Sequence, residues 1–110
     1  MEFKKVIEET EEVIKEFEKR ERKKWTPEIM ITELTKQLGE LSKQIMMLEK
    51  NYLVQRDSNK EYSHSKERLA GELSDIFYII IRLANYYQVD LEKTHIDELN
   101  KAKKWFKENN

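Results

Sequence analysis

Apolar residues recur along this chain at steps of three and four, the spacing of one helix face rather than of a strand. The first stripe is amphipathic, with Glu and Lys on the other faces of the same segment. Glu16 precedes Arg20 by four residues, which is the favourable order for an ion pair on a helix. The stripe consists of Phe3, Val6, Ile7, Thr10, Val13, Ile14 and Phe17. The pattern predicts a helix over about residues 2–23, with the basic run 19–24 as a solvated helix end.

A second helix is predicted over about residues 27–54. Thr26 suits the N-cap position, and Pro27 suits the first helical position because its missing N–H would have no partner there. The apolar seam that follows steps by four and three and is typical of a helix packed against neighbouring helices. The seam consists of Met30, Leu34, Leu38, Leu41, Ile45, Leu48 and Tyr52.

Two further helices are predicted over about residues 65–87 and 91–106. A polar segment without periodicity precedes the third helix, for which Ser63 or Ser65 is the expected N-cap, and Asp90 is expected to cap the fourth. The third helix is apolar around most of its circumference, which is typical of a buried central helix. Since no segment shows a strand pattern, we expect a single all-α domain over residues 1–110, an antiparallel four-helix-bundle-like protomer that is oligomeric.

Composition narrows the possible functions. The 110 residues are 39% charged, with 21 Lys+Arg against 22 Asp+Glu, so the net charge gives no general reason to expect nucleic-acid or membrane-surface binding. The absence of cysteine excludes disulfides, zinc–thiolate sites and thiol nucleophiles. The N-terminus lacks the apolar region of a signal peptide, and the longest apolar run, Ile76–Ile81, is too short to span a bilayer. A cytoplasmic protein is therefore expected.

Both glycines of the chain open the tetrapeptide GELS, at Gly39 and at Gly71. Glycine inside a helix costs roughly 1 kcal/mol relative to alanine, so some gain should offset it. A missing side chain would let another helix or a bulky substrate approach the backbone beside the following glutamate. The alternative is a simple close crossing of two helices, with both glutamates in solvent.

The carboxylates beside these glycines are candidates for chemistry. Glu72 and Asp75 are three residues apart and share one face of the third helix. On the second helix, Gln37 and Glu40 share a stripe that also contains Glu33 and Gln44. Antiparallel packing would allow Glu40 to face the other two carboxylates, and their repulsion would be relieved by protonation, by Lys or Arg, or by a cation. Oxygen ligands without His or Cys favour Mg²⁺, or Mn²⁺, together with phosphate.

These segments resemble the MazG-like all-α nucleoside triphosphate pyrophosphohydrolases. The resemblance is carried by TPEIMITELTKQLGELSKQI and by LAGELSDIFYIIIRLANYYQVDLEK, and it covers roughly residues 25–99. It implies a homodimer or homotetramer in which Glu40, Glu72 and Asp75 are catalytic and, with Gln37, bind Mg²⁺. In such a family a metal-activated water attacks the α-phosphate of a nucleoside triphosphate and releases a monophosphate and pyrophosphate.

The chain departs from that family at two places. Gln37 occupies the position of the first glutamate of the Glu-x-x-Glu motif, and a neutral amide supplies no charge. Lys101 and Lys104 are the candidates for phosphate binding on the last helix, although they are equally explained as ordinary exposed lysines. The alternative to the enzyme is thus a catalytically impaired homologue that acts as a nucleotide-binding or protein-interaction helical module. A purely structural helical assembly is the third reading.

Overall fold

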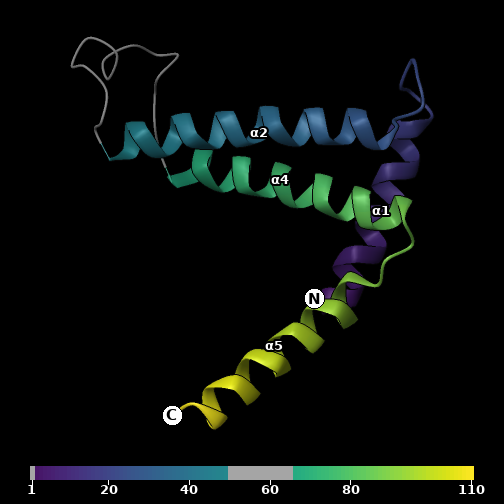
Figure 1. Cartoon of the computed structure of the whole chain (residues 1–110). Coiled ribbons are helices and arrows are strands. Elements are labelled where there is room, and N and C mark those ends of the chain that lie inside the picture. The colour runs from purple at the N-terminus through teal and green to yellow at the C-terminus, as the bar shows by residue number, and fades with distance from the viewer. Residues whose placement is uncertain (1, 50–65) are drawn as a thin grey trace. The chain divides into compact units, whose positions relative to one another are not determined.

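The structure, a computed structural model, describes residues 2–49 and 66–110 (Figure 1). These residues form four α-helices and no strand, which confirms the all-α prediction. The helices are α1 (Phe3–Glu18), α2 (Pro27–Leu48), α4 (Lys66–Tyr86) and α5 (Leu91–Glu108). The bundle arrangement and the oligomeric state stay predictions.

The first helix is shorter than predicted, because α1 ends at Glu18 rather than near residue 23. The N–H groups of Arg20 and Glu21 both donate to the carbonyl of Phe17, at 2.9 and 3.0 Å, so the last turn tightens and the chain then leaves the helix. Phe17 is also the last apolar residue of the stripe, so no apolar side chain supports another turn. The predicted end of the second helix and the serine caps of the third lie outside the described residues.

The predicted N-caps of two helices are confirmed. The Thr26 hydroxyl accepts a hydrogen bond from the Ile29 N–H at 3.3 Å, and the Asp90 carboxylate accepts one from the Lys93 N–H at 3.0 Å. Each bond satisfies a backbone donor that the first helical turn leaves without a partner. These caps explain why α2 and α5 begin where the sequence predicts.

The end of α4 is a turn that sequence reasoning did not identify in detail. Gln88 adopts a left-handed conformation with φ of 56°. The Val89 N–H then donates to the Ala84 carbonyl at 2.8 Å and the Gln88 N–H donates to the Asn85 carbonyl at 3.2 Å. This is the Schellman arrangement, which usually places glycine at the left-handed position.

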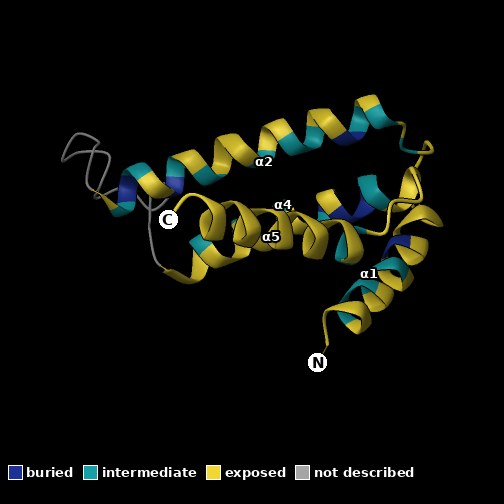
Figure 2. Cartoon of the chain, turned by 60° about the horizontal axis from the view of Figure 1, so that its bottom comes forward, coloured by how far each residue is buried: buried dark blue, intermediate teal, exposed yellow. Residues whose placement is uncertain are grey.

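The chain divides into two compact units. Unit 1 comprises Met1–Lys24 and Ile81–Asn110, and unit 2 comprises Trp25–Ile80. Within unit 2, α2 and the part of α4 up to Ile80 lie side by side and run in opposite directions (Figures 1 and 2). The two predicted motif helices are thus neighbours in one compact unit.

Buried residues are few in both units. Ile14 and Ile81 are buried in unit 1, and Met30, Met47 and Ile79 are buried in unit 2. The methionines therefore fill a core, as expected of a flexible apolar side chain. Helix α5 has no buried residue, and Figure 2 shows exposed residues along most of its length. In the described part of the chain, no helix has the length and apolar character that a bilayer span requires.

Candidate functional site

Unit 2 carries all four predicted metal ligands. Gln37 and Glu40 lie on α2, and Glu72 and Asp75 lie on α4. Gln37 and Glu72 are half-buried, whereas Glu40 and Asp75 are exposed. Each of the two helices therefore carries one half-buried and one exposed candidate ligand.

The burial of residues along each helix indicates which side of the helix faces its neighbour. On α2 the inward row repeats every seven residues as Met30, Gln37 and Gln44, of which the outer two are buried and Gln37 is half-buried. On α4 the corresponding row is Glu72 and Ile79, half-buried and buried. Residues seven apart lie nearly in line on a helix, so each row marks the side that packs within unit 2.

From helix geometry we infer that Glu40 and Asp75 lie on the same side of the helix pair. Each follows an inward residue, Gln37 or Glu72, by three positions, which turns it about 60° around its helix from the inward row. Because the helices are antiparallel, the same rotation on both places the two carboxylates at one common edge of the pair. The expectation that the motifs share one face of the two-helix unit is consistent with this geometry, and we call this edge the acidic side.

In the part of the chain that the structure describes, the three predicted carboxylate ligands have no cationic partner. Among the described residues, Glu40, Glu72 and Asp75 make no side-chain hydrogen bond or ion pair, whereas Glu33 lies 3.5 Å from the ammonium of Lys36. Exposure to water reduces the repulsion between such groups and makes the lack of a partner tolerable. They are therefore available to a cation or a cationic ligand from outside the chain.

The carboxylates do not gather into a metal-binding cluster. In residues 2–49 and 66–110, no group of three or more His, Asp or Glu side chains is arranged to hold a metal ion. The donor chemistry, three carboxylates and one amide oxygen, suits Mg²⁺, but the positions of the donors do not provide a shared coordination sphere. The metal set of Gln37, Glu40, Glu72 and Asp75 stays a prediction.

The glycines are not explained by a close helix crossing within the described chain. A Cβ built at Gly39 or at Gly71 would meet no atom within 4 Å, and both positions are exposed. The cost of roughly 1 kcal/mol for a helical glycine is therefore not offset by a contact inside unit 2. A crossing with a helix outside the described residues and the approach of a bulky substrate both stay predictions.

The predicted phosphate-binding lysines lie in unit 1, on α5. The Lys101 ammonium is 3.2 Å from the Glu98 carboxylate, and the Lys104 ammonium is 4.0 Å from Glu108. All four side chains are well exposed, and ion pairs of this kind contribute little to stability. This arrangement is what ordinary exposed lysines adopt, so a role in phosphate binding stays a prediction.

Sequence reasoning placed Gln44 in one stripe with Gln37 and Glu40 but did not predict that its side chain is buried. Gln44 is fully buried, and among the described residues neither its amide nitrogen nor its amide oxygen has a hydrogen-bond partner. A buried polar atom without a partner carries a desolvation cost, so this side chain is a local weakness of unit 2. The seven-residue spacing from Met30 and Gln37 is the signal that could have indicated its inward position.

Sequence reasoning also missed a buried ion pair in unit 1. The Arg82 guanidinium donates two hydrogen bonds to the Glu21 carboxylate, from Nη1 to Oε2 at 2.8 Å and from Nη2 to Oε1 at 2.6 Å. The prediction that residues 19–24 form a solvated helix end is therefore wrong for Glu21. Sequence reasoning could not foresee this contact, because 61 residues separate Glu21 from Arg82 and no local pattern indicates it.

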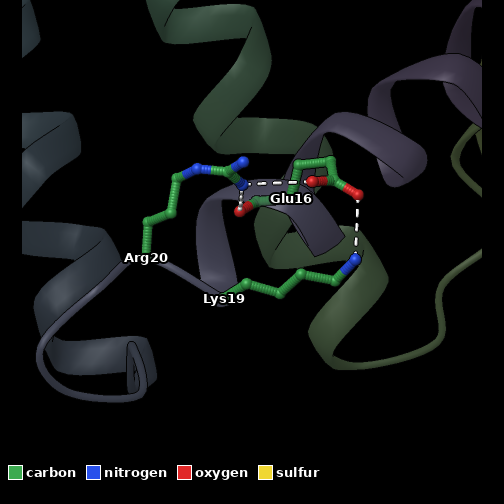
Figure 3. Close-up of polar contacts among 3 residues, drawn as sticks. All are labelled: Glu16, Lys19 and Arg20. Atoms are coloured by element: carbon green, nitrogen blue, oxygen red, sulfur yellow. Dashed lines mark hydrogen bonds and ion pairs between the residues drawn. The ribbon is translucent and has the colours of Figure 1, made fainter.

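The preceding residues of the same segment do behave as a solvated helix end. Glu16 accepts hydrogen bonds from Lys19 and from Arg20, each at 3.0 Å, as Figure 3 shows. These two cations, Lys19 first, hold the pKa of the Glu16 carboxyl below its ordinary value of 4.5. The predicted pair between Glu16 and Arg20 is confirmed.

Comparison with known proteins does not assign the chain to a family. No protein-family description, no curated protein and no solved structure matches the chain.

Proposed function

We propose that this protein is a Mg²⁺-dependent nucleotide pyrophosphohydrolase that cleaves a nucleoside triphosphate to a monophosphate and pyrophosphate. One observation carries the proposal: the two GELS motifs lie on neighbouring antiparallel helices of one compact unit. Helix geometry then leads us to expect Glu40 and Asp75 at a common edge. The sequence resemblance to MazG-like enzymes supplies the reaction class. The proposal includes assembly of the protomers as a homodimer or homotetramer.

The charges of the acidic side support a cationic or cation-bearing ligand. Glu40, Glu72 and Asp75 have no ion-pair partner among the described residues, so they can attract a hard cation. A nucleoside triphosphate is the common biological ligand that arrives with Mg²⁺ already bound. Glu40, Glu72 and Asp75 are the residues that would hold it, and a bound Mg²⁺ would neutralise charge on the phosphates. The open space beside Gly39 and Gly71 admits a group close to the backbone.

A second candidate is favoured by two specific observations. Gln37 removes one negative charge from the predicted set, and the carboxylates do not form a three-ligand group among the described residues. A homologue with these properties would bind a nucleotide or a protein without hydrolysis. The two candidates differ in one measurable quantity, the release of pyrophosphate.

The deciding experiment measures pyrophosphate release from a panel of nucleoside triphosphates with Mg²⁺ or Mn²⁺. The full chain is compared with Gln37→Glu, with Glu72→Gln and with Thr32→Glu. Gln37→Glu adds a carboxylate at the weakened position and should raise the rate at least about tenfold, because ligand charge tunes the affinity of a site for a hard cation. Thr32→Glu is the matched control, since it adds the same charge on an exposed outward position of α2.

The outcomes separate the candidates. Enzyme activity that rises only in Gln37→Glu and disappears in Glu72→Gln supports hydrolysis at the acidic side. If no variant releases pyrophosphate but nucleotide raises the melting temperature of the wild type, the protein is a nucleotide-binding module without hydrolytic activity. An equal effect of Gln37→Glu and Thr32→Glu would show that general charge, rather than this site, controls activity.

A further inference from the structure

A hollow in unit 1 is bounded by α1 and by the turn that joins α4 to α5. Its volume is about 250 Å³, which equals the liquid volume of roughly eight water molecules. All of its lining residues belong to unit 1, so the hollow is a feature of one compact unit. The apolar part of its lining consists of Ile7, Ile81, Ala84, Val89 and Leu91.

A second hollow of about 450 Å³ adjoins the first and also lies within unit 1. It continues along α1 to Lys4 and along the first turn of α5 to Glu92. The residues that line both hollows are Ile7, Glu11, Val89, Asp90 and Leu91. Because so much of the lining is shared, an extended ligand can occupy both hollows, and we call the two together the unit 1 groove.

The unit 1 groove is lined by more negative than positive charge. Four carboxylates line it and one ammonium, that of Lys4. The chain as a whole is almost balanced, with 21 Lys+Arg against 22 Asp+Glu, so this excess is local. A hollow lined by one sign of charge raises the local concentration of the opposite charge. The four carboxylates are those of Glu8, Glu11, Asp90 and Glu92.

The groove carboxylates have no cationic partner among the residues that the structure describes. Glu8, Glu11 and Glu92 make no side-chain hydrogen bond or ion pair there. Asp90 accepts a hydrogen bond from the Lys93 N–H, but the Lys93 ammonium lies 3.2 Å from Asp97 instead. Partial burial of a carboxylate without a partner carries a desolvation cost, and both Glu11 and Glu92 are half-buried.

Helix capping accounts for only part of this charge. Asp90 and Glu92 lie at the N-terminus of α5, where negative charge suits the helix dipole. Glu11 lies in the middle of α1, where neither the dipole nor a protein cation in the described chain stabilises it. Its half-buried carboxylate beside the apolar lining is therefore the observation that points to a cationic ligand.

We propose that the unit 1 groove binds an aliphatic polyamine. Its ammonium groups pair with the carboxylates, and its methylene chain lies against the apolar lining. Glu8 and Glu11 are three residues apart, about 4.5 Å along the axis of α1, a spacing that a short methylene chain can match. The amide oxygens of Asn85 and Gln88, which line the first hollow, can accept further hydrogen bonds from an ammonium group.

A polyamine uses both properties of the groove. A hydrated metal ion would gain nothing from the apolar lining, and a neutral apolar molecule would leave the carboxylates without a partner. A flexible chain that carries several positive charges pairs with each carboxylate in turn and buries its methylenes. The site lies in unit 1 and the predicted metal ligands lie in unit 2, so this inference does not rest on the proposed function.

The experiment measures the affinity of the full chain for spermidine by isothermal titration calorimetry, in about 50 mM salt and without nucleotide. Glu11→Gln should weaken binding at least about fivefold, because it removes a half-buried carboxylate. Asp90→Asn should weaken it about threefold, and asparagine keeps the N-cap of α5. Circular dichroism checks that both variants keep the helical content of the wild type.

Two controls separate the groove from other negative charge. Glu9→Gln removes an exposed carboxylate of α1 that lines neither hollow and should change the affinity by less than about twofold. Glu72→Gln removes a carboxylate of unit 2 and should also leave spermidine binding unchanged. A titration with Mg²⁺ in place of spermidine tests for a simple cation site.

A second measurement does not depend on any variant. In NMR spectra of the methyl-labelled wild type, the spermidine methylenes should show nuclear Overhauser effects to the methyl groups of Ile7, Ile81 or Val89. These three residues line the first hollow. Contacts to methyl groups of unit 2 alone would place the ligand elsewhere and overturn the proposal.

The outcomes are distinct. Weaker binding in Glu11→Gln and Asp90→Asn, with unchanged binding in both controls, supports a polyamine site in the groove. Equal weakening in Glu9→Gln overturns it, because the general charge of α1 would then be responsible. Absence of spermidine binding, equal affinity for Mg²⁺, or binding of a basic peptide alone also overturns it. Pyrophosphate release is measured separately, so none of these results decides the proposed function.

Discussion

Each of the two units contains a buried polar side chain, and the two side chains differ in their hydrogen bonding. In unit 1, Arg82 is almost fully buried and donates two short hydrogen bonds to Glu21. In unit 2, Gln44 is fully buried and neither atom of its amide has a partner among the described residues. One group is charged and satisfied, and the other is neutral and unsatisfied.

This difference shows that burial alone does not predict the effect of a polar residue on stability. A buried charge with its partner is tolerated, yet removal of that partner leaves an uncompensated charge and is strongly destabilising. A buried amide without a partner carries a cost in the native state, so an apolar replacement of similar volume should relieve it. Substitutions at the two positions should therefore change stability with opposite signs.

The largest effect is expected from Glu21→Gln. The substitution removes the negative charge opposite Arg82 and should lower the free energy of unfolding by about 3 kcal/mol, within the range for breaking a buried pair. Urea denaturation followed by circular dichroism measures it. Glu18→Gln, at an exposed position of α1, is the control and should change stability by less than about 0.5 kcal/mol.

A double substitution tests the cause of that loss. Adding Arg82→Met to Glu21→Gln removes the buried cation that has lost the Glu21 carboxylate. This should recover most of the stability, because an apolar replacement of a buried pair is often neutral. If Glu21→Gln behaves like Glu18→Gln, the pair contributes no more than a surface ion pair and the comparison of the two units fails.

An intermediate effect of the opposite sign is expected from Gln44→Met. Methionine has a similar volume and no polar atom, so the free energy of unfolding should rise by about 1–2 kcal/mol. Gln37→Met is the control in the same row, and its half-buried side chain should give a smaller change. A destabilised Gln44→Met protein would show that the amide has a hydrogen-bond partner in solution.

The smallest effect is expected at Glu16, which is exposed and paired with Lys19 and Arg20. Because its pKa is lowered in the folded protein from the ordinary value of 4.5, folding favours the ionised form. Its contribution to stability is present above that value and is lost as the pH falls through the lower, folded-state pKa. Glu16→Gln should therefore lose less stability than the wild type on acidification below pH 4.5, and the difference should shrink in high salt.

Local patterns predicted the helices of this protein because each signal is a property of neighbouring residues. The three-and-four spacing, the threonine before Pro27 and the aspartate at position 90 act within one or two turns. The same reasoning extended α1 too far, because residues 18–24 have good helix propensity but include no apolar side chain to support another turn. For the candidate site, the sequence named the residues and the structure placed them on two adjacent helices.

The sequence by itself determined that the described chain is helical, where α2 and α5 begin, and that carboxylates and apolar residues occupy different faces of α2 and α4. Only the tertiary structure decided that Glu21 reaches Arg82, that Gln44 is buried with no hydrogen-bond partner among the described residues, and that α2 and α4 are antiparallel neighbours. The physical reason is distance along the chain. Helix periodicity orders residues within a few turns, whereas contacts between helices depend on which faces can be buried together.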